Sequence, residues 1–138
     1  MAKNLTLVVC VDDHLGMTFC GRRQSKDRVQ RARLMALLGG KRLWMSPYSA
    51  KLFGELEGVC AHENYARKAK TGDALFAEDS IPSLKGVDTV VLYDWNEYYP
   101  SDVSFPYDLE KEGFALESAE EFVGSSHKNI TERIYKRV

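Results

Sequence analysis

The stretch "LTLVVCVDDHLGM", residues 5 to 17, carries the clearest secondary-structure signal in the chain. From Leu5 to Asp12 it is almost continuously apolar and rich in β-formers, which predicts a strand buried on both faces of a sheet. The next residues, as far as Gln24, contain two glycines and show little periodicity, which predicts a loop. Arg22 and Arg23 stand in this loop, just before a predicted helix. The first question that the sequence raises is whether the loop binds a ligand or only connects the strand to the helix.

Strands and helices alternate along the rest of the chain. A helix is expected from Lys26 to Leu38, with Ser25 as its N-cap and Gly39 at its end. Ser49 is expected to cap a second, short helix. The helix that Ser49 caps is expected at 50–58, and a third helix at 62–72. Further strands are expected at 41–46, 73–79, 88–96, 113–117 and 130–137. This order predicts one α/β domain over residues 1–138, with three layers and a mixed, mostly parallel sheet flanked by helices and closed by an antiparallel C-terminal strand pair.

Composition narrows the class of protein. The formal net charge of −1 gives no global electrostatic reason to expect nucleic acid or an anionic membrane as a partner. The apolar run near the N-terminus is too short to span a membrane. Cys10, Cys20 and Cys60 form no Cys-x-x-Cys pair, so we expect neither a disulfide framework nor a thiolate metal site, and we expect a reducing cytoplasm.

Several motifs occur in an order that resembles the dihydrofolate reductases. They are "LVVCVDDHLGM", "SKDR", "GKRLWMSPYSAKLF" and the C-terminal "FPYDLEKEGFALESAEEFVGSSHKNITERIYKR". The resemblance covers most of the chain and implies the fold of that family. It also implies that the acid of the first helix, Asp27, faces a pocket between that helix and the sheet.

Four departures from the family pattern concern the cofactor and substrate sites. The loop after Met17 lacks the Pro-Trp of the family, and Pro47 stands where the family has an arginine that holds cofactor phosphate. Glu78 and Asp79 stand where the family has a Gly-Gly pair that lets the backbone approach the dinucleotide. A strand and its flanking loop are expected to be missing after Gly58. Together these departures argue against NADPH-dependent reduction, so we expect no cofactor.

A second resemblance links "GRRQSKDR", "LWMSPYSAKLF" and "GSSHKNI" to a group of small bacterial proteins, some of which carry a ribonuclease Z label. That label implies a His-x-His-x-Asp-His metal motif. The three histidines of this chain are widely spaced, so we expect no metal site of that kind. The Asp12-Asp13-His14 sequence is interpreted as a turn, with a metal cluster as the alternative.

The loop between Arg22 and Asp27 is the leading candidate site. Arg22 and Arg23 precede a helix and could hold a phosphate or carboxylate; alternatively they pair with surface acids. Asp27 could sit in a pocket with a raised pKa, or could simply occupy the first turn of the helix.

Two functional hypotheses follow. In the first, the cleft that binds substrate in the dihydrofolate reductases binds a small anionic or heterocyclic ligand in this chain. The residues expected to bind it are Arg22, Arg23, Asp27, Tyr48, Ser49, Tyr93 and His127. In the second, the chain is an enzyme of hydrolase or nuclease type that uses the loop from Arg22 to Asp27 with His127 or Cys20. A homodimer contact through the exposed aromatic stretch "NEYYPSD" is a further expectation.

Overall fold

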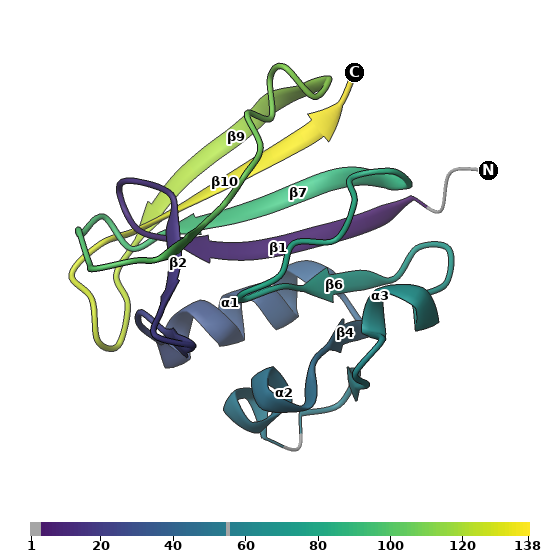
Figure 1. The fold of residues 1–138 in the computed structure, drawn as a ribbon, viewed down its shortest axis with the longest axis horizontal. Coiled ribbons are helices and arrows are strands. Elements are labelled where there is room, and N and C mark those ends of the chain that lie inside the picture. The colour runs from purple at the N-terminus through teal and green to yellow at the C-terminus, as the bar shows by residue number, and fades with distance from the viewer. Residues whose placement is uncertain (1–3, 55) are drawn as a thin grey trace.

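A seven-stranded mixed sheet forms the centre of the protein (Figure 1). The computed structural model describes residues 4–54 and 56–138. The strands follow the order β5-β4-β6-β1-β7-β10-β9 across the sheet. They are β1 (Leu5–Val11), β4 (Leu43–Met45), β5 (Val59–Ala61), β6 (Ala74–Phe76), β7 (Val87–Asp94), β9 (Phe114–Phe122) and β10 (Ile130–Arg137). The pairings from β5 to β7 are parallel, whereas β10 runs antiparallel to both β7 and β9.

The predicted loop after β1 contains two short strands. β2 (Gly16–Phe19) pairs with β3 (Arg22–Arg23) and with β8 (Val103–Ser104) in a small antiparallel sheet. The turn before β2 is organised by Asp12, whose carboxylate accepts hydrogen bonds from the N–H groups of His14 and Gly16, both at 2.8 Å. The prediction of a turn at Asp12-Asp13-His14 agrees with this geometry.

The caps of the first two helices lie two and three residues away from the expected ones. α1 (Arg28–Leu38) is capped by Asp27 and not by Ser25, and it ends at Gly39 in the left-handed conformation, as predicted. α2 (Pro47–Phe53) is capped by Ser46 and not by Ser49, because Pro47 takes the first helical position. α3 (Tyr65–Lys68) is a single turn, much shorter than the helix expected over 62–72.

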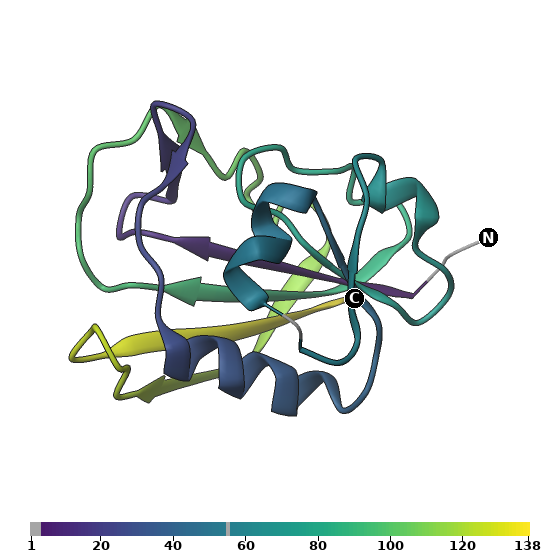
Figure 2. The same cartoon turned by 90° about the horizontal axis from the view of Figure 1, so that it is seen from below.

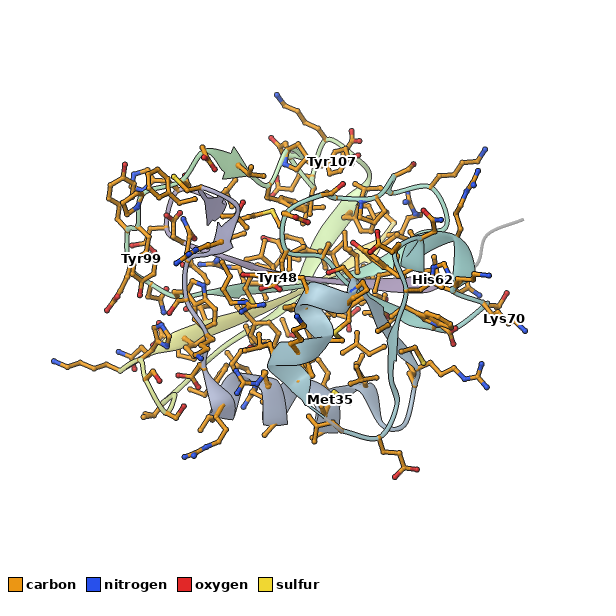
Figure 3. All side chains as sticks on the ribbon, turned by 60° about the horizontal axis from the view of Figure 1, so that its bottom comes forward. Met35, Tyr48, His62, Lys70, Tyr99 and Tyr107 are labelled. Carbon is orange, nitrogen blue, oxygen red and sulfur yellow. The ribbon has the colours of Figure 1, made fainter. Side chains whose placement is uncertain are left out.

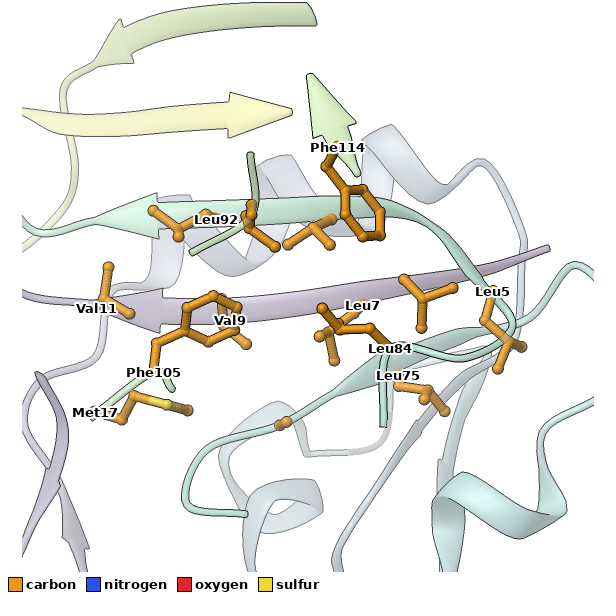
Figure 4. Close-up of a cluster of buried hydrophobic side chains, with 14 of the residues drawn as sticks. Leu5, Leu7, Val9, Val11, Met17, Leu75, Leu84, Leu92, Phe105 and Phe114 are labelled. Carbon is orange, nitrogen blue, oxygen red and sulfur yellow. The ribbon is translucent and has the colours of Figure 1, made fainter. Parts of the chain in front are cut away.

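The side chains of β1 alternate between two hydrophobic cores. Leu5, Leu7, Val9 and Val11 point into one core, which is shown in Figure 4, whereas Val8 points into the other. β1 is thus buried on both faces, as its continuous apolar run predicted.

The two faces of the sheet are covered differently. α1 and α2 lie over one face, where Leu34, Leu38 and Phe53 join the second core (Figures 1 and 2). The opposite face is covered mainly by non-helical segments, from which Leu84, Phe105 and other residues enter the first core. The α/β class, the mixed sheet and the antiparallel final pair are confirmed. One strand was not among those expected: β5 directly follows Gly58.

Across residues 4–54 and 56–138, no helix is long and apolar enough to cross a lipid bilayer.

Candidate functional site

Ser25, His127 and Asp27 form a continuous chain of hydrogen bonds beside the first helix. The Oγ of Ser25 lies 2.7 Å from Nε2 of His127, and Nδ1 of His127 lies 2.9 Å from Oδ2 of Asp27. Ser25 and Asp27 come from the segment between β3 and α1, whereas His127 comes from the connection between β9 and β10. The fold therefore brings together groups that are about a hundred residues apart in the sequence.

Asp27 is fully buried, and both of its carboxylate oxygens accept hydrogen bonds. Burial by itself raises the pKa of Asp27. The hydrogen bonds to His127 and to backbone N–H groups lower it by more, so that the pKa lies well below its usual range. Of the two alternatives that the sequence left open for Asp27, the raised pKa is therefore contradicted. The donors are the backbone N–H groups of Val29, Gln30, Ser125 and Ser126 and the Nδ1 of His127, at 2.8 to 3.1 Å.

The charge of Asp27 determines the hydrogen-bonding roles of His127. Because an ionised carboxylate only accepts hydrogen bonds, Nδ1 of His127 must carry a proton. In the neutral imidazole Nε2 is then an acceptor, and the hydroxyl of Ser25 donates to it. The ring is also held by Trp95, which stacks on it with 4.5 Å between ring centroids. The histidine is thus fixed in one orientation with its basic nitrogen on the serine.

Ser25 borders a small cavity of about 10 Å³, which is room for no more than one water molecule. Arg23, Glu78 and Trp95 also line it. Cys10 lies in the same wall, where burial raises the pKa of its thiol far above the usual value and keeps it neutral.

The cavity is closed on one side by an ion pair between Arg23 and Glu78. Nε and Nη2 of Arg23 donate to the two carboxylate oxygens of Glu78, at 2.7 and 3.0 Å. The hydroxyl of Ser49 donates to the same carboxylate at 2.6 Å, and the ring of Tyr48 lies 4.5 Å from the guanidinium of Arg23. Figure 3 labels Tyr48 on α2, close to the middle of the view. Two of the residues expected to bind a ligand, Arg23 and Ser49, therefore meet at Glu78, and a third, Tyr48, packs on Arg23.

The remaining predicted residues lie elsewhere. Arg22 is exposed on β3. Tyr93 is fully buried in the second core, and its hydroxyl donates to Glu132 at 2.8 Å. Burial and the negative charge of Glu132 raise the pKa of Tyr93, so it remains a donor. The ligand-binding hypothesis placed Tyr93 in the cleft; the structure places it in the second core with Leu34 and Leu38 of α1.

Cys20 lies in the exposed turn between β2 and β3, where its N–H donates to Asp102 at 3.1 Å. The hydrogen bonds and the ring contact of His127 involve Ser25, Asp27 and Trp95, and not Cys20. Ser25 was missed as a candidate because it was interpreted as a helix cap. Nothing local in the sequence indicates its contact with His127. Within the described ranges, no three His, Cys, Asp or Glu side chains are placed to hold a metal ion.

The sheet order, the antiparallel final strands and the two longer helices on one face match a dihydrofolate reductase-like fold. A dihydrofolate reductase from Enterococcus faecalis, solved in complex with NADP(H) and RAB-propyl, is similar to this chain with a TM-score of 0.70. The match covers 99% of this chain and 98% of that one, at 11% sequence identity. No family model and no curated protein matches the sequence. The likeness is one of fold, and the fold expected from the sequence is confirmed.

Proposed function

We propose that this protein is a hydrolase-type enzyme in which Ser25 is the nucleophile, His127 the general base and Asp27 the acid that orients the histidine. The observation that carries this proposal is the pair of distances from His127, 2.7 Å to Ser25 Oγ and 2.9 Å to Asp27 Oδ2. A serine is activated by a base within hydrogen-bond reach that is itself oriented by a third group. Both requirements are met, because His127 lies within hydrogen-bond reach of Ser25 and Asp27 orients His127.

The chemistry follows from these roles. Ser25 Oγ attacks a carbonyl or phosphoryl centre and forms a bond to it, while its proton passes to Nε2 of His127. The ionised Asp27 stabilises the resulting imidazolium. His127 then returns the proton to the leaving group, and water, activated in the same way, releases the product from Ser25. The guanidinium of Arg23, which also lines the cavity, is the group available to neutralise the developing negative charge.

Access to Ser25 depends on the ion pair beside it. The cavity is too small for a substrate while Arg23 and Glu78 are paired. Ser25 itself is half-buried, so its exposed side offers one approach. We therefore expect substrate to displace Glu78 from Arg23, and we expect Glu78→Ala to increase the reactivity of Ser25.

The proposal is tested with a fluorophosphonate reagent, which labels activated serines. We expect Ser25 to be labelled and Ser25→Ala to abolish labelling, with Ser118→Ala on β9 as a control that leaves it unchanged. His127→Gln should slow labelling roughly 100-fold or more, because the base is removed. Mass spectrometry of the labelled peptide identifies the site. Labelling of Ser25 no faster than that of Ser118 would show that the serine is not activated.

A second candidate is a binding protein for a small anionic or heterocyclic ligand, without chemistry. It is supported by the meeting of Arg23 and Ser49 at one carboxylate, with the ring of Tyr48 against Arg23, since these groups could exchange Glu78 for an anionic ligand. In that case Ser25→Ala retains full affinity and Arg23→Gln loses it. On either reading, Glu78 and Pro47 at positions that contact cofactor in the family argue against a dinucleotide, and we expect NADPH fluorescence to be unchanged on mixing with the protein.

A further inference from the structure

The most basic part of the sequence, from Arg22 to Arg33, is divided by the fold into paired and unpaired cations. Arg23 pairs with Glu78, and Arg33 pairs with Glu132 and Glu120. Three other cations from this window instead share one open cavity of about 380 Å³ next to the start of α1. The cavity is lined by Lys26, Arg28 and Arg31 together with Asp27, Ser125 and Ser126.

These three cations have no anionic partner within residues 4–54 and 56–138. In the part of the chain that the structure describes, none of their side chains forms an ion pair. Nη1 of Arg31 is buried and has no hydrogen-bond partner among the described residues. Burial lowers the pKa of Arg31, and the nearby charges of Arg23 and Arg28 lower it further. Arg31 also lines the open cavity, so its positive charge acts on any anion that enters there.

Asp27 in the wall of the cavity does not serve as that anionic partner. Its two carboxylate oxygens already accept five hydrogen bonds, from backbone N–H groups and His127. Its negative charge acts on Arg31 only at a distance, as one of several influences on the pKa. Three cations against one carboxylate leave the lining with an excess of two positive charges.

We propose that this cavity binds the phosphoryl group of a small molecule. Two excess positive charges match a phosphate dianion, and the planar forks of Arg28 and Arg31 suit its oxygens. The hydroxyls of Ser125 and Ser126 on the facing wall supply further polar groups. A small molecule fits better than a nucleic acid, since the net charge of the chain is −1 and the exposed strand β9 carries three glutamates, Glu117, Glu120 and Glu121. The proposal does not depend on the reactivity of Ser25.

The test is a calorimetric titration of the full chain with inorganic phosphate. We expect saturable binding to one site, weakened about tenfold by Arg28→Gln and by Arg31→Gln, because each variant removes one charge-assisted contact. Arg42→Gln removes the same charge from an exposed position outside the cavity and should leave the affinity unchanged. Arg28 is exposed, so its variant is expected to fold even where Arg31→Gln is destabilised.

Further titrations separate the sources of phosphate and the two proposals. Adenosine monophosphate binding tighter than phosphate, with no binding of adenosine, would assign the site to a phosphomonoester; equal affinities would assign it to free phosphate. Ser25→Ala should bind phosphate as the unmodified protein does, which keeps this result independent of the fluorophosphonate test. An absence of phosphate binding, an equal loss in Arg42→Gln, or binding of single-stranded RNA alone would overturn the proposal.

Discussion

At the scale of single residues, Asp27 is the group on which the site is organised. A buried carboxylate is destabilising unless its lone pairs are satisfied, and here burial is offset by five donors. Two of them are the backbone N–H groups at the start of α1, so the same side chain caps the helix. Asp27 therefore has two roles: it caps α1 and it orients the ring of His127.

The first prediction is that Asp27→Asn destabilises the protein by about 3 kcal/mol at pH 7, because one end of the amide cannot accept the donors that face the carboxylate. The exposed Asp79→Asn is the matched control and should be nearly neutral. The pKa of Asp27 is lowered on folding, so its contribution is present above 3.8, the usual value for an aspartate, and is lost as the pH falls below it. Urea unfolding measured from pH 7 to pH 2 should show the two proteins converging in stability at the acid end. A constant difference across this range would contradict the prediction.

At the scale of elements, the connection between β9 and β10 folds onto the start of α1. Ser125 and Ser126 donate to Asp27 from that connection, and Gly124 packs directly against the same carboxylate. A Cβ at residue 124 would lie 2.3 Å from Oδ2 of Asp27 and 2.9 Å from Cδ1 of Ile130. Glycine is therefore required here by the close approach of two elements.

The second prediction is that Gly124→Ala costs about 2 kcal/mol, because neither the pinned carboxylate nor the buried Ile130 can move freely. The natural control is a double-mutant cycle with Asp27→Ala, which removes the clashing atoms. The cost of Gly124→Ala should fall by half or more in that background, as measured by thermal or urea unfolding. Additive costs would mean that the contact with Asp27 is not the cause.

At the scale of the whole molecule, α1 is held to the sheet by a second polar network. Nε and Nη2 of Arg33 donate to the carboxylate of Glu132 at 3.1 and 3.2 Å, and Tyr93 donates to the same carboxylate. The network joins α1, β10 and β7, and Glu132 is buried. The removal of its cation would leave a buried charge without compensation.

The third prediction is that Arg33→Met destabilises the protein by about 3 kcal/mol. Adding Glu132→Gln should recover part of that loss, because the unpaired charge is then removed as well. Arg42→Met, at an exposed position, is expected to change the stability by less than about 0.5 kcal/mol. Guanidinium unfolding of the unmodified protein and the three variants gives these differences. If the double variant is no more stable than Arg33→Met, the unpaired charge of Glu132 is not the cause of the destabilisation.

The elements themselves followed from local patterns. The apolar run of β1, the stop of α1 at Gly39 and the pairing of the last two strands are each encoded within a short window, so they could be predicted. The helix caps were displaced because Asp27 and Ser46, and not Ser25 and Ser49, bond the first N–H groups. The helix expected at 62–72 is a single turn in the structure, and β5 was not among the expected strands.

The burial of β1 on both faces is a property of composition and periodicity along the chain, whereas the arrangement of the sheet was expected from the resemblance to the dihydrofolate reductases. The candidate site is not such a property, because its contacts join residues that are far apart: 102 positions separate Ser25 from His127, and 55 separate Arg23 from Glu78. Which side chain faces which is decided by how the β9–β10 connection and α2 pack against the loop after β3. Local preferences cannot specify such pairings, since they depend on the positions of whole elements in space.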